Sequence, residues 1–267
     1  MCPEMSELVA VFRPETDAAI NAASSALGLV RGRAGADDVS LKAARDVVTA
    51  TDIAVEEAVR ASLAEALGHP VVGEEAGGEP AVGGSYWLVD PICGTSNFAS
   101  GIPLYCVNIA LVEHDEVTVA VVGDPSMGEI HAAEKGNGAW ALHGSERRRL
   151  RVTDESRTLV IEDSHADPDP ARRERAAKSV ANAIRAFRWD IRALSTTLAL
   201  AYVAAGRVSA YVLFWTSALH AGAGSLLAAE AGATVSDIDG RPWTTQSDSI
   251  VASATAELHD SLLELTR

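Results

Sequence analysis

Two short stretches of the chain place carboxylates directly after apolar runs. Residues 71–75 read VVGEE and residues 87–101 read WLVDPICGTSNFASG, so that Glu74 ends one apolar run and Asp90 ends the other. Carboxylates at the ends of neighbouring strands can share a hard divalent cation such as Mg²⁺, which prefers oxygen ligands. The Gly-Thr-Ser-Asn run at 94–97 is suited to opening a helix whose free backbone N–H groups bind an anion. Together, these stretches predict a divalent-metal site for a phosphate group.

The composition is that of an ordinary globular chain with strong negative charge. Its 267 residues include 22 basic and 37 acidic side chains, a formal net charge of −15. Such a field disfavours nucleic acid and anionic membranes, and no apolar run reaches the roughly 18 residues of a membrane span. The acidic N-terminus argues against a secretory signal. Three cysteines without disulfide or metal-type spacing fit a reducing compartment. We therefore expect a cytoplasmic protein.

The first half of the chain reads as two helices and a run of short strands. Apolar periodicity predicts a helix over 14–27, and a second helix begins near Thr51 or Asp52. Short strands with tight turns follow, with a break at 123–125 and a hairpin signal at 136–138. This pattern predicts a largely antiparallel sheet that is flanked by the two helices.

The second half alternates strands with helices. The expected strands and helices, in chain order, are 159–162, 170–187, 195–205, 208–214, 220–231 and 250–252. Alternation of this kind predicts a smaller, layered α/β half. We expect an N-terminal α+β domain with the metal and phosphate site over residues 1–152, and a C-terminal α/β domain over residues 153–267.

Taken together, these segments resemble the inositol monophosphatase family. Its members are magnesium-dependent phosphomonoesterases related to fructose bisphosphatases and to the phosphatases of adenosine 3′,5′-bisphosphate. The resemblance covers nearly the whole chain, through matching segments at 42–52 (KAARDVVTATD), 73–75, 87–103, 136–139, 203–211 (VAAGRVSAY) and 230–232. It implies the α/β sugar-phosphatase fold of this family, a layered α-β-α-β-α sandwich, and subunits that pair as dimers.

The resemblance also assigns roles to the two acidic stretches. It implies one Mg²⁺ held by Glu74, Asp90 and the backbone carbonyl of Ile92. Such an ion polarises the phosphoryl group and lowers the pKa of a bound water. Thr95 and Asp52 resemble the pair that positions the attacking water, so that the catalytic candidates are Thr95, Asp52 and Glu74. The candidate substrate-binding residues are Gly94, Thr95, Ser96, Cys93 and His220.

The second metal site of the family is not reproduced. Where the family has DPxDGTxNF, this chain has DPICGTSNF, with Cys93 in place of the second aspartate. A further aspartate in WDxAAGxLLxxEAGG aligns with His220, counting ten residues back from Glu230, while other registers place Leu219 or Thr216 there. No register restores a carboxylate, and a cation site without two anionic oxygens loses most of its attraction. The family's Gly-Ser near the sugar pocket is also changed, to Leu194-Ser195.

Cys93 admits three interpretations. It could be a small, weakly polar filler left after the metal was lost. It could be a thiolate nucleophile at a helix N-terminus, although the charges of Glu74 and Asp90 oppose this by raising the thiol pKa. It could also join His220, Asp90 and Glu74 in a softer, zinc-like metal site. His220 has its own simpler interpretation, as a helix-start or core histidine.

Two classes of function follow from these departures. The first is a repurposed inositol-monophosphatase-like protein with lost or strongly altered phosphomonoesterase activity, serving as a ligand-binding or partner subunit of a small-molecule biosynthetic enzyme. The alternative is an active metal-dependent phosphatase that hydrolyses a small phosphate monoester with one Mg²⁺ or an altered metal. The expected partners are a small phosphorylated molecule or a protein, in a homodimer or hetero-oligomer. The basic run at 147–151 reads as a solvated strand, with docking of an acidic partner or a nucleotide phosphate as the alternative.

Overall fold

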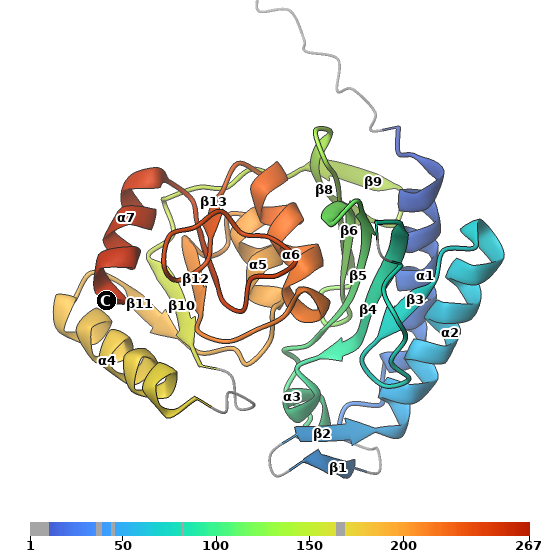
Figure 1. The fold of residues 1–267 in the computed structure, drawn as a ribbon, viewed down its shortest axis with the longest axis horizontal. Coiled ribbons are helices and arrows are strands. Elements are labelled where there is room, and N and C mark those ends of the chain that lie inside the picture. The colour runs from blue at the N-terminus through green and yellow to red at the C-terminus, as the bar shows by residue number, and fades with distance from the viewer. Residues whose placement is uncertain (1–10, 36–38, 44–45, 82, 164–168) are drawn as a thin grey trace, which may run out of the picture.

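Two large sheets, each covered by helices, make up most of the chain (Figure 1). The structure, a computed structural model, describes residues 11–35, 39–43, 46–81, 83–163 and 169–267. The N-terminal segment, on which the expectation of no secretory signal depends, lies largely outside these residues, and so do residues 44–45 of the family-like segment at 42–52.

The first sheet has seven strands within the described residues, in the order β3-β4-β5-β6-β7-β8-β9. Its strands are β3 (Val71–Gly73), β4 (Ser85–Cys93), β5 (Cys106–Glu113), β6 (Glu116–Asp124), β7 (Glu129–Glu134), β8 (Gly138–His143) and β9 (Glu146–Arg149). All neighbours are antiparallel except β3 and β4, which run parallel. The predicted largely antiparallel sheet is therefore confirmed.

Helices cover both faces of this sheet. Helices α1 (Pro14–Val30) and α2 (Ala50–Leu67) pack on one face, and α5 (Leu198–Ala204) and α6 (Ala218–Glu230) pack on the other. Because side chains alternate along a strand, Trp87 of β4 joins the core under α1 and α2, while Leu88 joins the core under α5 and α6. Burial on both faces explains why the strand reads as one continuous apolar run.

The second sheet has five strands within the described residues, in the order β11-β10-β12-β14-β13. Its strands are β10 (Thr158–Glu162), β11 (Asp190–Arg192), β12 (Ala210–Leu213), β13 (Thr234–Ser236) and β14 (Ile250–Ser253). Helices α5 and α6 lie between the two sheets, and α4 (Pro170–Ala186) and α7 (Ala256–Leu265) cover the outer face (Figure 1). The layers confirm the predicted α-β-α-β-α sandwich; the division into domains at residue 152 stays a prediction.

Three predicted boundaries in the first half are wrong. Helix α1 continues through Gly28 to Val30, and β6 runs on to Asp124 instead of breaking at 123–125. A Cβ at Gly123 would lie 3.0 Å from the Leu27 side chain, so this glycine allows α1 to approach the sheet. The N-cap of α2 is Thr49, not Thr51 or Asp52. The helices expected at 195–205 and 220–231 form at slightly different bounds, α5 and α6.

A short hairpin and a short helix complete the part of the fold that borders the candidate site. Strands β1 (Val39–Ala43) and β2 (Asp46–Thr49) pair antiparallel, and β2 contacts the five-residue helix α3 (Thr95–Ala99). Thr49 ends β2 and caps α2, so the hairpin, α2 and α3 meet at this point.

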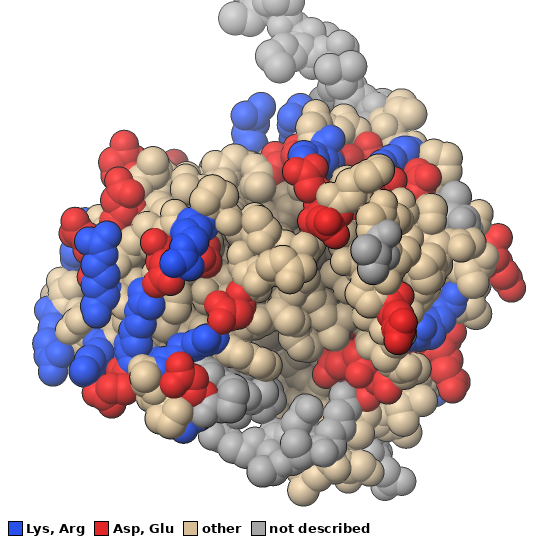
Figure 2. All heavy atoms as spheres, viewed as in Figure 1, with Lys and Arg blue, Asp and Glu red and all other residues tan. Residues whose placement is uncertain are grey.

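Charged side chains of both signs are interspersed over the surface. Figure 2 shows lysine and arginine side chains among acidic ones, both around α4 and near the end of the sheet formed by β8 and β9. All four residues of β9 are exposed. Arg147 stacks over the Phe12 ring at 5.2 Å and Arg149 over the Trp140 ring at 5.6 Å. These contacts fit the interpretation of the basic run as a solvated strand.

Candidate active site

The two acidic turns lie side by side because β3 and β4 are parallel neighbours. Gly73 pairs with Val89 in the register of the two strands, so Glu74 and Asp90 follow the same pair. The backbone N–H of Glu74 donates to the Val89 carbonyl at 3.2 Å, so the hydrogen bonding between the two strands extends to Glu74. The two acidic stretches therefore lie side by side, but Asp90 does not follow the end of its strand as expected, because β4 continues through Asp90 to Cys93.

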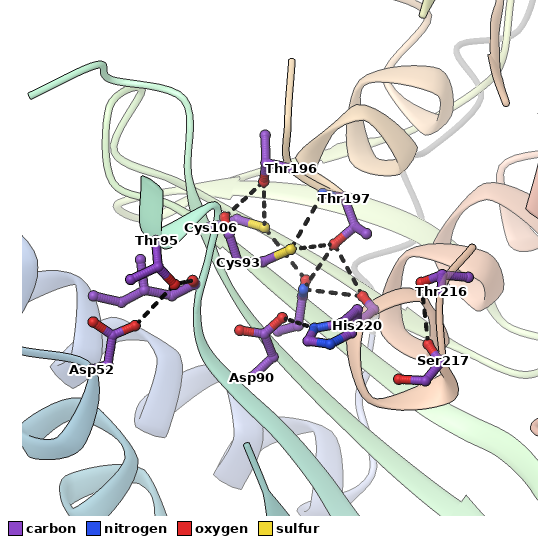
Figure 3. A network of polar contacts seen from close by, with 12 residues as sticks. Asp52, Asp90, Cys93, Thr95, Cys106, Thr196, Thr197, Thr216, Ser217 and His220 are labelled. Atoms are coloured by element: carbon purple, nitrogen blue, oxygen red, sulfur yellow. Dashed lines mark hydrogen bonds and ion pairs between the residues drawn. The ribbon is translucent and has the colours of Figure 1, made fainter. Parts of the chain in front are cut away.

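Asp52 is positioned by the capping box of α2. Its carboxylate accepts from the Thr49 backbone N–H at 2.9 Å and from the Thr49 hydroxyl, while the Thr49 side chain accepts from the Asp52 N–H. Thr95 Oγ1 lies 3.2 Å from Asp52 Oδ1 and 3.0 Å from the Ile92 carbonyl oxygen (Figure 3). Asp52 is fully buried. Burial raises the pKa of its carboxyl more than the hydrogen bonds from Thr49 and Thr95 lower it.

Asp90 is fully buried and only half satisfied. Its Oδ2 lies 2.8 Å from Nδ1 of His220. Its Oδ1 has no hydrogen-bond partner among the described residues. An unpaired buried carboxylate oxygen is costly, and a cation is the partner that removes this cost. The donors that the resemblance implies, Glu74, Asp90 and the Ile92 carbonyl, are all oxygen atoms, the type that Mg²⁺ prefers, and the unpaired Asp90 Oδ1 is suited to such an ion.

Cys93 lies at the end of β4, and its sulfur belongs to a polar network (Figure 3). The Thr197 backbone N–H donates to Cys93 Sγ at 3.3 Å, and the Thr197 hydroxyl lies 3.0 Å from the same sulfur. Contact with the Cys106 thiol, burial and the charge of Asp90 raise the pKa of Cys93 well above its ordinary value. The side chain is 8% exposed. This environment does not support a thiolate nucleophile.

His220 lies in the first turn of α6, and its side chain contacts Asp90. The structure therefore favours the alignment that places His220, and not Leu219 or Thr216, at the position of the family's aspartate. The backbone carbonyl of His220 accepts from the Asn108 side chain at 3.1 Å and from the Thr197 hydroxyl at 3.0 Å. Burial opposes the charged imidazole, but bonds to Asp90 and Cys93 raise the pKa of His220 well above its ordinary value. Leu219 instead packs against the core, and Thr216 bonds to the neighbouring Ser217 away from the cluster (Figure 3).

The predicted phosphate turn requires glycine at its centre. Gly94 has a φ of 102°, and a Cβ there would lie 3.0 Å from the Leu104 carbonyl oxygen and 3.1 Å from Thr196. Helix α3 starts directly after it, at Thr95. Ser96 is exposed. The structure thus brings the predicted residues of this turn to one place, while their contacts to a substrate stay a prediction.

Glu56 and Arg60 are side chains at the site that the sequence interpretation missed. Glu56 is 1% exposed and accepts from the backbone N–H groups of Glu75 at 2.6 Å and Ala76 at 3.0 Å. Arg60 donates to Glu56 at 2.9 Å and to the Val71 carbonyl at 2.8 Å. Their spacing of four residues predicts an ion pair on the helix, but it does not indicate the contacts with the turn.

A cavity of about 330 Å³ opens next to the changed Leu194-Ser195 pair. It is lined by Leu104, Met127, Thr158, Val160, Arg192, Leu194, Tyr202, Arg207 and Val208. The Glu162 carboxylate accepts from the N–H groups of Leu194 at 3.0 Å and Ser195 at 2.7 Å, and so fixes this segment.

Comparison with known proteins identifies the class that this fold and site define. The family model described as "Inositol monophosphatase family" matches residues 11–267. The Nus factor SuhB of Pseudomonas aeruginosa is 36% identical over 261 residues, covering 91% of this chain and 93% of that protein. The inositol-1-monophosphatase of Mesorhizobium japonicum is 35% identical over 221 residues, covering 80% of each.

Solved structures agree with the sequence matches. An inositol monophosphatase (IMPase) of Thermotoga maritima superposes with a TM-score of 0.79 at 28% identity and covers 94% of this chain and 95% of its own. The extragenic suppressor protein SuhB of Bartonella henselae gives 0.83 at 26% identity, with coverage of 94% and 97%. The chain therefore belongs to the inositol monophosphatase family. Among its described residues, no helix combines the length and apolarity needed to span a membrane.

Proposed function

We propose that the chain is a metal-dependent phosphomonoesterase that hydrolyses a small phosphate monoester, with one Mg²⁺ held by Glu74, Asp90 and the Ile92 carbonyl. The observation that carries the proposal is the unpaired, buried Oδ1 of Asp90, in a site that also contains the Asp52–Thr95 hydrogen bond. Relatives named inositol monophosphatase favour this alternative over the interpretation as a non-hydrolytic partner subunit.

The Asp52–Thr95 pair supplies the proton path. The Thr95 hydroxyl donates its proton to Asp52 or to the Ile92 carbonyl, and its remaining lone pair can accept a proton from a water molecule. Because burial raises the pKa of Asp52, its carboxylate is a better proton acceptor than an exposed one. A bound Mg²⁺ would polarise the phosphoryl group and lower the pKa of the attacking water.

The test is a hydrolysis assay of the purified protein with inositol phosphate, fructose bisphosphate and adenosine 3′,5′-bisphosphate, in Mg²⁺ and in Mn²⁺. We expect metal-dependent turnover that falls about 10²- to 10⁴-fold in Asp52→Asn and Thr95→Val. Ser100→Ala, an exposed position after α3, is the matched control and should keep full activity. No turnover with any of these esters would favour the non-hydrolytic partner subunit.

The remaining expectations are proposals of the same kind. A small phosphorylated molecule is the proposed ligand, a homodimer or hetero-oligomer the proposed assembly, and the cytoplasm the proposed location. Light scattering on the purified chain measures the assembly directly, and a monomer would exclude the homodimer.

A further inference from the structure

Asp90, Cys93 and His220 form a three-ligand cluster at the position where the resemblance predicted a lost metal. Each of them offers one donor atom, and these atoms all lie within 4.8 Å of one another. We propose that the cluster binds a borderline-soft divalent ion of the zinc type through one oxygen, one sulfur and one nitrogen. This inference extends the proposed function, whose active site it shares, but it does not require that the protein turn over a substrate.

The donor set selects the class of ion. Zinc accepts thiolate sulfur at about 2.3 Å and imidazole nitrogen or carboxylate oxygen at about 2.0–2.2 Å, in tetrahedral geometry. These bond lengths place the ligand atoms roughly 3.3–3.8 Å apart. The three donor atoms all lie within 4.8 Å of one another. Asp90 Oδ2 and His220 Nδ1 are hydrogen-bonded at 2.8 Å, so these two atoms would move apart by about 0.5 Å to bind one ion. Mg²⁺ prefers six oxygen ligands and fits this set poorly.

One hydrogen bond and one unpaired oxygen suit the cluster to a cation. The Thr197 backbone N–H donates to Cys93 Sγ at 3.3 Å, which is the kind of outer-sphere bond that stabilises a metal-bound thiolate. Asp90, fully buried, keeps Oδ1 without a partner among the described residues, so its carboxylate is under-satisfied even with His220 in place.

The ligands come from elements whose positions are fixed before any ion binds. Asp90 and Cys93 belong to β4, and His220 belongs to the first turn of α6. The Asn108 side chain and the Thr197 hydroxyl both donate to the His220 carbonyl and hold this turn against the sheet. The His220 side chain is 30% exposed, which leaves a route for the ion and an open coordination position for water.

Binding is balanced by proton release. The ion replaces the proton of the Cys93 thiol and the proton shared between His220 and Asp90, and both protons pass to solvent. The bound state then contains a thiolate, a neutral imidazole and a carboxylate. No oxidant or reductant is involved.

Cobalt substitution tests the proposal without using activity. Chelator-treated protein is titrated with Co²⁺ alone and with Zn²⁺ alone, metal content is measured after desalting, and a thiolate-to-cobalt charge-transfer band is sought in the near ultraviolet. We expect about one ion per chain with the band present, and loss of the band with at least about tenfold weaker binding in Cys93→Ser and His220→Ala.

Cys106→Ser is the matched control. Cys106 is fully buried and lies directly opposite Cys93 on β5, but it is not one of the three ligands. Its variant should keep the band; the band and not the affinity is the readout here, because the Cys106 thiol contacts Cys93. A band that survives in Cys93→Ser, or no band at saturating Co²⁺, would overturn the proposal. If Cys93→Ser does not fold, X-ray absorption of the zinc-loaded natural protein decides, because a zinc shell without sulfur excludes Cys93.

The two proposals fail separately. Mg²⁺-dependent turnover without a sulfur-bound ion would overturn the soft-metal site and leave the proposed phosphatase intact. A sulfur-bound ion in a protein that hydrolyses none of the esters would support the site and overturn the proposed activity.

Discussion

Glu56 connects α2 to the turn that carries Glu74, and its replacement tests how the fold builds the metal site. The buried carboxylate accepts two backbone N–H groups of that turn, from Glu75 and Ala76, and pairs with Arg60 at 2.9 Å. Arg60 in turn donates to the Val71 and Gly77 carbonyls on either side of the turn. We expect Glu56→Ala to destabilise the protein and Glu56→Gln to weaken the site.

The size of the effect follows from these contacts. Removing one partner of a buried ion pair costs about 3–5 kcal/mol. The two N–H groups add little to this cost, because Glu75 is half-buried and Ala76 is exposed, so water can replace the carboxylate as their acceptor. The Arg60 side chain is 26% exposed, so water replaces part of its lost interaction. We therefore expect Glu56→Ala to lower the free energy of unfolding by about 3 kcal/mol, at the lower end of this range. Glu56→Gln keeps one carbonyl oxygen and should cost about 1–2 kcal/mol.

Two measurements separate stability from site geometry. Urea unfolding gives the free energy of unfolding of each variant, and turnover against Mg²⁺ concentration gives the half-saturating concentration. Glu56→Gln should stay folded but require more Mg²⁺, because the turn that carries Glu74 loses an anchor. Glu57→Gln, on the exposed face of the same helix, is the control and should change the unfolding free energy by less than about 0.5 kcal/mol.

Either of two results would refute this reasoning. One is a Glu56→Ala protein whose unfolding free energy lies within about 0.5 kcal/mol of the natural protein, since that is the range of a neutral surface change. The other is a folded Glu56→Gln protein with unchanged Mg²⁺ dependence. Gly73→Ala should disturb the same Glu56–Arg60 ion pair by steric overlap, because a Cβ at this position would collide with Glu56 Oε1 and would lie 2.7 Å from Arg60 Nη2.

Two further changes test other parts of the structure. Gly94→Ala should lower the free energy of unfolding by about 1–3 kcal/mol, because its φ of 102° strains any side chain; an unchanged urea midpoint would contradict this. Glu129→Gln should cost about 1–3 kcal/mol at pH 7, because His131 and Arg207 lower the pKa of Glu129 from 4.5 to about 2. Because the pKa of Glu129 is lower in the folded state, its contribution to the free energy of unfolding is complete above about pH 4.5 and disappears as the pH falls through about 2. Urea unfolding at several pH values measures this dependence. Glu116→Gln, at an exposed ion pair, is the control and should show little dependence.

The layers of the fold and the placement of the two acidic turns could be predicted because they depend on local patterns. An apolar run that ends in a carboxylate is visible in the sequence, and the parallel pairing of β3 with β4 then brings Glu74 and Asp90 together. The predicted break of the strand at Gly123 was wrong because the role of this glycine depends on a contact between distant parts of the chain. Glycine is a common chain breaker, but here it makes room for Leu27 of a distant helix, which no local pattern reveals.

Glu56 could not be recognised from helix periodicity alone. An acidic residue in the first turns of a helix is ordinarily explained by the helix dipole. Its actual partners are backbone groups of Glu75 and Ala76, 19 and 20 residues further along the chain. Bonds of this kind depend on how α2 packs beside β3, and only the assembled structure defines that packing.

The assembled structure also changes the interpretation of the second metal position. Counting carboxylates predicted that the position was lost, because Cys93 and His220 replace two aspartates of the family pattern. The structure shows that the side chains of Cys93 and His220, which replace the two aspartates, both lie beside Asp90. In the metal-bound state three carboxylates would carry three negative charges, whereas a carboxylate, a thiolate and a neutral imidazole carry two. A smaller charge with sulfur and nitrogen donors weakens a hard ion and favours a borderline-soft one. We therefore expect the identity of the preferred metal, more than the presence of a metal, to distinguish this chain from relatives that keep both aspartates.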